Sequence, residues 1–261
     1  MDKIIEKSSE IIAETKWSEI MKLHWNYRIY LPKEYKENLN KKYPVLYFLH
    51  GWGGNVTNTS DESRIDSKSL IDNMIDNKEI NPIIVVFIDG FNSFYLDGPL
   101  FKMKSAIVKD LIPFIDSKYR TLIDKKNRAI AGISMGGFGA LNIGLSNSDM
   151  FSSMGLMSPA IWDRGEEINP IYGSPLAKIY YEDFYENLIR KNEKRDIRIF
   201  TYHGKDDNII SFNNIDRFVC FSKNSGFKVK YELQDIGPHS WDTWREMYPK
   251  ILRDINNEFS K

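Results

Sequence analysis

A serine stands at the centre of a G-x-S-x-G sequence, Gly132–Gly136, between the apolar run Ala129–Ala131 and a helical pattern from Phe138 onward. Glycines two residues before and after the serine permit a turn that bulkier side chains would obstruct. A serine at the start of a helix also lies beside unpaired backbone N–H groups, which stabilise an oxyanion. The motif alone is a weak signal, but the strand, turn and helix together predict Ser134 as a nucleophile; the alternative is a serine that only caps the helix.

A serine nucleophile needs a base, and the chain offers four histidines. His24, His50 and His203 lie beside earlier strand patterns. His239 follows the last strand pattern and precedes the terminal helix, so its loop is expected at the carboxyl edge of the sheet, where Ser134 also emerges. We therefore predict His239 as the general base and a structural role for His50, the alternative for His239 being a capping or surface histidine.

The acid that orients the imidazole is expected on a loop after a late strand and before the histidine. Asp207, in the sequence Gly-Lys-Asp-Asp, meets this condition, and its neighbour Asp206 is a close rival. Asp163 is a topological alternative. Asp235 stands very near His239 in sequence, which disfavours it.

A second glycine-rich loop, His-Gly-Trp-Gly-Gly, follows the apolar strand pattern Val45–Leu49. Such a loop lets the backbone approach a reacting carbonyl group closely. We predict an oxyanion hole made of two main-chain N–H groups, those of Trp52 and Met135. A simple turn at the end of the strand is the alternative.

Aromatic residues flank the predicted catalytic loops. We predict substrate contacts for Trp52, Tyr95 and Trp162, with Phe94 and Trp241 nearby, although any one of them could instead pack in the core. The sequence holds no metal-ligand spacing, phosphate-binding loop or dinucleotide motif. The chemistry is therefore expected to use no cofactor and no metal.

Short runs rich in β-branched and aromatic residues alternate with longer helical patterns, which is typical of crossover units around a mostly parallel sheet. The strand patterns are Trp25–Tyr30, Val45–Leu49, Ile83–Ile88, Ala129–Ala131, Ser153–Leu156, Ile197–Tyr202 and Val229–Leu233. The helical patterns are Met103–Tyr119, Phe138–Leu145, Ile209–Ser222 and Trp241–Phe259. They predict a single α/β domain over residues 1–261, with helices on both faces of the sheet and a cap-like insertion at about 162–194.

Charge and composition limit the classes of partner that the chain is expected to bind. Lys+Arg and Asp+Glu both number 36, so the chain has no overall electrostatic field that would favour binding to nucleic acid or to an anionic membrane. Cys220 is the single cysteine, which excludes an intrachain disulfide. The first residues mix charges with isoleucines, unlike a secretory signal, and the apolar run Ile83–Ile88 is far too short to span a membrane. We predict a cytoplasmic protein.

From about Tyr27 to Leu252 the chain resembles the esterase D or feruloyl-esterase-like branch of the α/β hydrolases. The sequences that carry the resemblance are YRIYLPKEY, KKYPVLYFLHGWGG, INPIIVVFIDG, LIPFIDSKYRT, AIAGISMGGFGALNIGL, FSSMGLMSPA, YHGKDD and GPHSWDTWREMYPKIL. The resemblance implies the α/β-hydrolase fold, Ser134 as nucleophile and His239 as base. The family's acid stands three residues after the glycine of a G-x-x-D loop, which implies Asp207 rather than Asp206. The family's oxyanion donors correspond to Trp52 and Met135.

Departures from the family pattern narrow the expected activity. S-formylglutathione hydrolases usually carry a cysteine just beyond the oxyanion loop, where this chain has Gly53–Asn55. Larger enterochelin esterases carry an extra N-terminal domain, and secreted xylan esterases an export signal. In size and lack of a signal the chain is most similar to short-chain, tributyrin-type esterases.

The expected function is therefore hydrolysis of a carboxylic ester through a Ser-His-Asp triad and an acyl-enzyme. The expected substrates are short-chain acyl (acetyl or butyryl) or aryl/feruloyl esters of a small molecule or carbohydrate. Two alternatives stay open: an acyltransferase of the same family, and a catalytically silent hydrolase fold that serves as a binding module.

Overall fold

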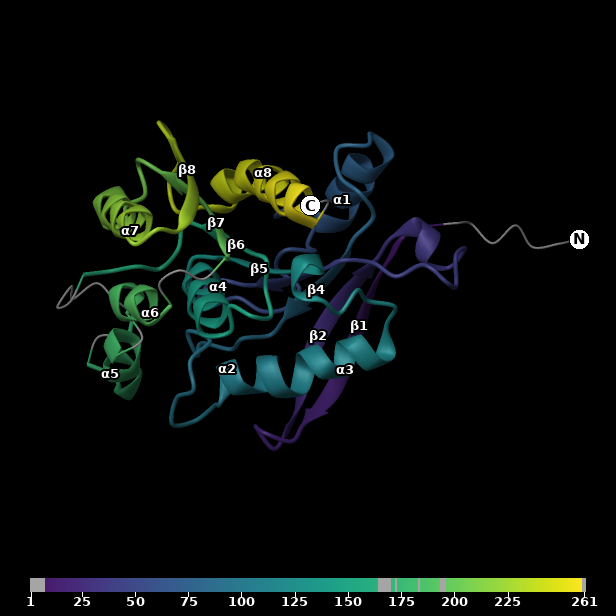
Figure 1. Cartoon of the computed structure of the whole chain (residues 1–261), viewed down its shortest axis with the longest axis horizontal. Helices are drawn as coiled ribbons and strands as arrows, with labels where there is room; N and C mark the ends of the chain where they lie inside the picture. The colour runs from purple at the N-terminus through teal and green to yellow at the C-terminus, as the bar shows by residue number, and fades with distance from the viewer. Residues whose placement is uncertain (1–7, 164–169, 172, 183, 193–195, 260–261) are drawn as a thin grey trace, which may run out of the picture.

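The computed structural model describes residues 8–163, 170–171, 173–182, 184–192 and 196–259. Within these ranges eight strands form one sheet in the order β1-β2-β4-β3-β5-β6-β7-β8 (Figure 1). The strands are β1 (Glu10–Ser18), β2 (Leu23–Leu31), β3 (Val45–Leu49), β4 (Ile84–Ile88), β5 (Arg128–Ile133), β6 (Ser153–Met157), β7 (Arg198–Gly204) and β8 (Lys228–Gln234). β1 pairs with β2 and β2 with β4 in antiparallel fashion, and the other pairs are parallel. The predicted mostly parallel α/β-hydrolase sheet is confirmed.

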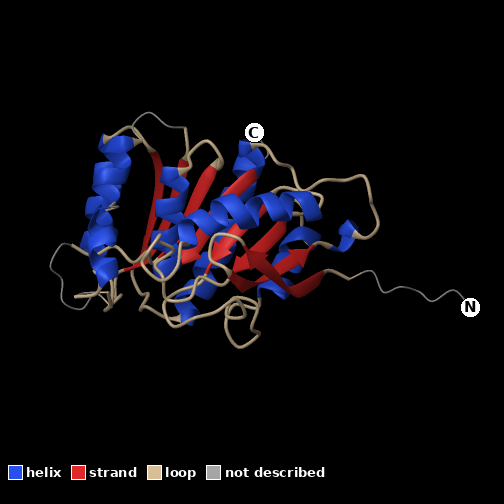
Figure 2. Cartoon of the chain, turned by 90° about the horizontal axis from the view of Figure 1, so that it is seen from below, coloured by secondary structure: helices blue, strands red, loops and turns tan. Residues whose placement is uncertain are grey.

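Helices cover both faces of this sheet, as Figure 2 shows from below. The α-helices are α1 (Ser67–Asp76), α2 (Met103–Ala106), α3 (Ile112–Lys118), α4 (Met135–Ser146), α5 (Pro175–Glu182), α6 (Tyr185–Lys191), α7 (Phe212–Asn224) and α8 (Trp241–Phe259). Short 3-10 turns span Lys33–Tyr35 and Lys125–Asn127, and a π-helical turn spans Ile107–Leu111. None of the helices in the described ranges is both long and apolar enough to cross a membrane.

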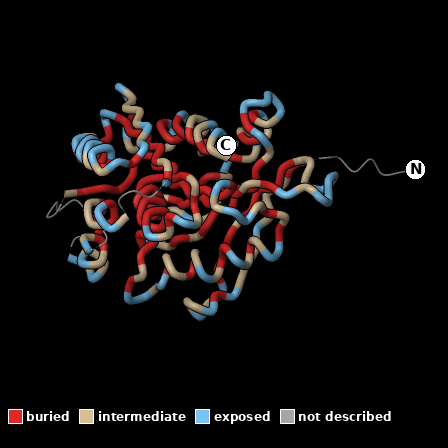
Figure 3. The backbone as a smooth tube through the Cα atoms, viewed as in Figure 1, coloured by how far each residue is buried: buried red, intermediate tan, exposed pale blue. Residues whose placement is uncertain are grey.

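Alternate strand residues feed two separate cores because successive side chains point to opposite faces of a sheet. In β3, Tyr47 packs in the core beneath α2, α3 and α4, whereas Leu46 and Phe48 pack in the core beneath α1 and α8. The central strands are buried along their whole length, and the outer faces of the helices are exposed (Figure 3). This double burial explains why β3, β4 and β5 read as continuous apolar runs.

Several elements differ from the sequence-based prediction, among them α1, which none of the predicted helical patterns covers. Met103–Lys118 is not a uniform helix: the π-helical turn separates α2 from α3, and Pro113 lies in the first turn of α3. Proline lacks the N–H that an α-helical ladder needs, so a wider turn precedes it. Strand β1 was not among the predicted strands, because its mixture of charged and apolar residues suits an edge strand with one exposed side.

The segment predicted as a cap lies partly outside the described residues, at 164–169, 172, 183 and 193–195. Its described part forms α5 and α6, and α6 packs against α4 and α7. Tyr180 of α5 is fully buried and donates a hydrogen bond to the carbonyl of Ala160 at 2.9 Å. This part of the segment is therefore joined to the main core, and its role as a cap stays a prediction.

Candidate active site

Ser134 occupies the sharp turn between β5 and α4, with φ 53° and ψ −115°. A non-glycine residue with positive φ carries backbone strain, which costs about 1–3 kcal/mol and persists only where the surroundings enforce it. Here they do: a Cβ at Gly132 would lie 2.3 Å from the carbonyl oxygen of Gly136, and one at Gly136 would lie 2.2 Å from that of Leu49. The two glycines are thus required by backbone contacts on either side of the serine.

Three side chains far apart in sequence form a continuous hydrogen-bonded chain. The Oγ of Ser134 lies 2.9 Å from Nε2 of His239, and Nδ1 of His239 lies 2.7 Å from Oδ2 of Asp207. Ser134 follows β5, Asp207 follows β7 and His239 follows β8, so all three lie at the carboxyl ends of parallel strands. The structure therefore brings together the three residues that were predicted as nucleophile, base and acid.

The loops after β7 and β8 touch through two glycines, which explains how Asp207 reaches His239. A Cβ at Gly204 would lie 1.7 Å from the carbonyl oxygen of Gly237, so neither loop has room for a side chain at the contact. The second carboxylate oxygen, Oδ1, accepts the N–H groups of Ile209 and Ile210 at 2.9 and 2.8 Å. The carboxylate is thus held at both oxygens.

These contacts set the charge of Asp207. Burial by itself favours the protonated acid, but the hydrogen bond from His239 and the N–H of Ile210 outweigh it and hold the pKa of Asp207 below its ordinary value. An ionised carboxylate can only accept, so the proton between the two side chains belongs to Nδ1 of His239. Nε2 then presents its lone pair to the Ser134 hydroxyl, as a base must.

The other acids considered lie elsewhere. Asp206 and Asp235 are exposed, and Asp163 forms an ion pair with Arg217. His203 lies buried behind Asp207, where its Nε2 is 3.0 Å from the carbonyl oxygen of Ile210. It supports the loop that carries Asp207, and among the described residues the hydrogen-bond partner of Ser134 Oγ is His239.

The loop after β3 approaches the serine from the opposite side. A Cβ at Gly51 would lie 3.4 Å from the Cβ of Ser134, and the backbone N–H of Gly53 donates to Oδ1 of Asn92 at 2.8 Å. Trp52 in this loop and Met135 at the start of α4 line the same cavity as Ser134. The first N–H groups of a helix have no carbonyl one turn earlier to bond, which leaves the N–H of Met135 suited to an oxyanion.

His50 anchors the same loop. Its Nδ1 lies 2.8 Å from the carbonyl oxygen of Gly51, and its Nε2 accepts the N–H of Gly90 at 2.9 Å. Because one ring nitrogen donates and the other accepts, the neutral imidazole satisfies both contacts. This position agrees with the structural role expected for His50.

A cavity of about 440 Å³ opens over the serine. It is lined mainly by aromatic and small residues from several loops: Gly51, Trp52, Gly53, Gly54, Asn58, Arg64, Phe94, Ser134, Met135, Ala160, Trp162, Pro170, Ile209, His239, Trp241 and Trp244. Trp52 is 44% exposed and Trp162 only 2% exposed, so the first stands at the mouth and the second in the wall. In the described part of the chain, no group of three or more His, Cys, Asp and Glu side chains is arranged to hold a metal ion.

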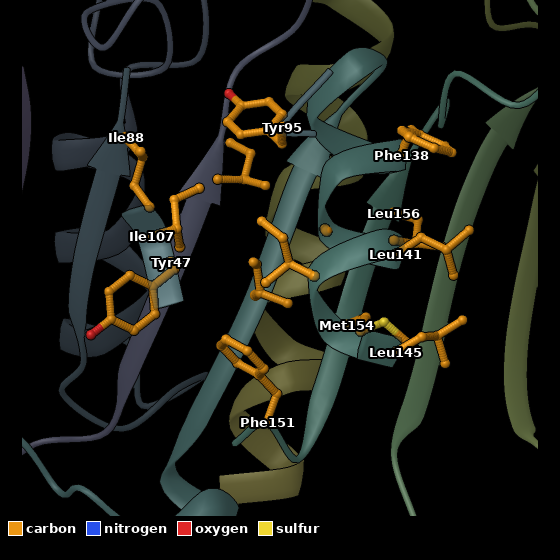
Figure 4. Close-up of a cluster of buried hydrophobic side chains, with 14 of the residues drawn as sticks. Tyr47, Ile88, Tyr95, Ile107, Phe138, Leu141, Leu145, Phe151, Met154 and Leu156 are labelled. Carbon is orange, nitrogen blue, oxygen red and sulfur yellow. The ribbon is translucent and has the colours of Figure 1, made fainter. Parts of the chain in front are cut away.

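The position of Tyr95 corrects one predicted contact. Tyr95 is fully buried, its hydroxyl donates to the carbonyl oxygen of His50 at 3.1 Å, and it does not line the cavity. Figure 4 draws it among the buried side chains of the core. Its neighbour Phe94 lines the cavity instead, between Trp52 and Trp162 at ring-centroid distances of 5.5 and 6.1 Å.

The sequence did not single out six of the wall residues: Asn58, Arg64, Ala160, Pro170, Ile209 and Trp244. Asn58 and Arg64 stand in a long irregular loop between β3 and α1, where no motif marks them. Trp244 lies one turn into α8, close in sequence to His239, and this position could have identified it. In the structure its ring packs edge-on against His239, with the ring centroids 4.9 Å apart.

Comparisons with known proteins show the family to which the chain belongs. A family model described as "Putative esterase" matches residues 18–255. An endo-1,4-beta-xylanase/feruloyl esterase of Xylanibacter ruminicola is 30% identical over 92% of this chain, and the chain spans only 30% of that protein's length. An acetyl esterase of Caldicellulosiruptor saccharolyticus is 30% identical over 77% of this chain and 79% of its own.

A solved structure supports the same assignment. A ferulic acid esterase superimposes with a TM-score of 0.86 at 27% identity, and the match covers 96% of this chain and 99% of the other. Fold, site geometry and sequence relationship therefore agree with the resemblance drawn from the motifs. The chain belongs to the putative esterase family, within the feruloyl-esterase-like branch of the α/β hydrolases.

Proposed function

We propose that this chain is a serine carboxylic-ester hydrolase that acts through Ser134, His239 and Asp207. The observation that carries the proposal is the unbroken chain of contacts from hydroxyl to imidazole to carboxylate, at 2.9 and 2.7 Å, at the floor of an aromatic cavity. Distances of this size permit proton transfer without rearrangement. Membership of the esterase family supports the same reaction class.

The reaction begins with attack of Ser134 Oγ on the ester carbonyl carbon. A bond forms between Oγ and carbon while the hydroxyl proton passes to Nε2 of His239. The carbonyl oxygen takes up the electron pair and is stabilised by the N–H groups of Trp52 and Met135. The negative Asp207 stabilises the imidazolium that has formed.

Collapse of this intermediate expels the alcohol. The bond from carbon to the leaving oxygen breaks, that oxygen takes the proton from Nε2 of His239, and Ser134 remains acylated. Water then attacks the acyl carbon and gives a proton to His239. The acid leaves, and the proton returns to Ser134 Oγ, which restores the starting state.

The expected substrates are acetyl, other short-chain acyl or aryl/feruloyl esters of a small molecule or carbohydrate. The names of the relatives, a feruloyl esterase and an acetyl esterase, favour these acyl groups. The cavity of about 440 Å³ with Trp52, Phe94 and Trp162 in its wall is large and apolar enough for an aryl acyl group.

The test combines labelling with turnover. We expect a fluorophosphonate to label Ser134 stoichiometrically, and a panel of acetyl, butyryl and feruloyl esters to be hydrolysed by the same preparation. Ser134→Ala should lose at least ~99% of esterase activity, because removal of an activated nucleophile typically costs ~10⁴-fold or more. Retained activity in Ser134→Ala, or label at another residue, would refute the mechanism.

A further inference from the structure

The cavity wall carries one charge that the hydrolytic mechanism does not use. Among the described residues that line the cavity, Arg64 is the only charged side chain apart from the titratable His239. Arg64 comes from the loop between β3 and α1, and its guanidinium lies over the ring of Trp241 at 4.8 Å from the ring centroid. A permanent cation therefore stands in the cavity wall beside an aromatic surface.

Ring contacts divide the cavity into two sides. On one side Phe94 touches both Trp52 and Trp162, and the described residues of this wall carry no charge. On the other side the order is His239, Trp244, Trp241 and then Arg64, with successive separations of 4.9, 5.0 and 4.8 Å. Arg64 thus belongs to the side of the catalytic imidazole.

The imidazole side receives the leaving group. His239 gives its proton to the oxygen of the departing alcohol, so this oxygen must lie against Nε2 when the acyl carbon is bonded to Ser134. The alcohol portion of the ester then extends along the Trp244 and Trp241 rings. Arg64 lies at the far end of this path.

The backbone that carries Arg64 is clamped in place. Arg245 of α8 donates to the carbonyl oxygens of Ser63 and Arg64, and its guanidinium is also paired with Asp242 at 2.9 Å. The N–H of Arg64 donates to the carbonyl oxygen of Asp61 at 3.0 Å. Arg245 is therefore occupied by structural contacts, and it fixes the point from which the Arg64 side chain extends.

The guanidinium of Arg64 keeps its hydrogen-bonding capacity for a ligand. Over the part of the chain that the structure describes, no carboxylate lies within ion-pair distance of it. The positive charge of Arg64 helps to lower the pKa of Asp61, but the two side chains form no ion pair, and Oδ1 of Asp61 accepts the N–H and hydroxyl of Ser63 at 2.9 and 2.7 Å. A guanidinium over a ring face leaves its N–H edge open to a planar acceptor, and a carboxylate matches that edge with two parallel hydrogen bonds.

We propose that Arg64 is a specificity residue that selects esters whose leaving alcohol bears a carboxylate. This inference rests on the proposed esterase function, because the leaving-group side is defined by His239. Substrates of this class are O-acyl esters of hydroxy acids or uronic acids. The acyl side, whose described lining residues are uncharged, selects the acyl group independently.

Matched aryl acetates test the proposal. The substrates are 4-acetoxybenzoate and 4′-acetoxybiphenyl-4-carboxylate, which place the carboxylate at two distances from the acetyl ester. Each is compared with the neutral compound in which the carboxylate is a methyl ester. The measured quantity is kcat/KM for the anionic ester divided by that for its methyl ester. Division of the wild-type ratio by the variant ratio cancels differences in intrinsic reactivity between the two leaving groups.

Three variants complete the design. Arg64→Met keeps an apolar stem against Trp241 and removes the charge, and we expect its ratio to fall about tenfold for at least one of the two substrates. Arg64→Lys keeps the charge and should fall less. Arg190→Gln removes another arginine that lies over an aromatic ring, that of Phe221 at 5.3 Å, away from the cavity, and should leave the ratio unchanged. Added salt should reduce the wild-type preference.

The outcomes separate this proposal from the proposed function. Hydrolysis of the methyl esters with equal ratios in wild type and Arg64→Met would overturn the role of Arg64 and leave the esterase intact. If no ester is hydrolysed, calorimetric titration of 4-acetoxybenzoate into Ser134→Ala, with and without Arg64→Met, still decides. Binding weakened about tenfold by Arg64→Met supports the carboxylate site, and equal binding overturns it.

Discussion

Replacement of Asp207 by asparagine exchanges one carboxylate oxygen for an NH₂ group and otherwise keeps the shape of the side chain. The two N–H donors of Ile209 and Ile210 select the amide oxygen for their side of the group. The NH₂ group must then face Nδ1 of His239, where Oδ2 of the carboxylate stands 2.7 Å away in the native chain. Two donors cannot share that contact, so Nδ1 must become the acceptor.

This change of tautomer disables the base. With Nδ1 unprotonated, Nε2 carries the hydrogen of the neutral ring and cannot accept the proton of Ser134. We expect kcat to fall by about 10⁴-fold, which corresponds to roughly 5 kcal/mol of transition-state stabilisation. The fold should be retained, because both N–H contacts to the amide oxygen persist.

The assay is the steady-state hydrolysis of 4-nitrophenyl acetate, with thermal unfolding as the check of folding. Asp206→Asn is the matched control: Asp206 is the exposed neighbour, and its replacement should leave kcat within about twofold. If Asp207→Asn kept more than ~10% of the native kcat while Asp206→Asn lost it, the assignment of the acid would be wrong.

Three further outcomes follow from local geometry. Tyr95→Phe removes a buried hydrogen bond to the carbonyl of His50 and should lower the unfolding free energy by about 1–2 kcal/mol in a urea titration. The KM for an ester should not change. A raised KM would mean that Tyr95 does line the cavity. Gly132→Ala places a Cβ 2.3 Å from the carbonyl oxygen of Gly136 and should destabilise the fold by about 3 kcal/mol. A lower melting temperature would show this loss, and an unchanged melting temperature would contradict the turn geometry. The lowered pKa of Asp207 means that its ionised form stabilises the fold above the ordinary carboxyl pKa of ~3.9, and that this contribution is lost as the pH falls through the lower folded-state value. Unfolding free energy should therefore drop less steeply below about pH 4 in Asp207→Asn than in the native chain, and parallel curves would refute the sign.

The sequence predicted that Ser134 and His239 would lie at the same edge of the sheet, and the structure places them in contact; their catalytic roles stay a prediction. Ser134 is fixed by glycines whose contacts are all within the turn or the adjacent strand, and His239 remained after three other histidines were placed beside earlier strands. Asp207 and Asp206 are adjacent on one loop, so the residues themselves left both open, and the resemblance implied Asp207. In the structure the contact between Gly204 and Gly237 and the two loop N–H groups help to turn Asp207 toward the imidazole.

The walls of the cavity were harder to predict. Phe94 and Tyr95 are neighbours that both have positive φ, 53° and 57°, so no periodic pattern tells which ring faces the cavity and which the core. Arg64 is positioned by Arg245, which lies 181 residues later on another element. A contact of that kind is set by tertiary packing and leaves no trace in the local sequence.

The position of the last strand, β8, affects when Ser134 becomes reactive as the chain folds. β8 is an edge strand: within the sheet it pairs with β7 alone, it is only half buried, and His239 lies just beyond it. A half-buried edge strand opens locally more readily than the interior strands. Each opening withdraws the imidazole, while the N–H groups of Trp52 and Met135, which we propose as oxyanion donors, stay in place. The rate at which a fluorophosphonate labels Ser134 therefore reports when β8 docks on β7. During refolding, we expect labelling to begin after the tryptophan fluorescence of the interior has reached its native value.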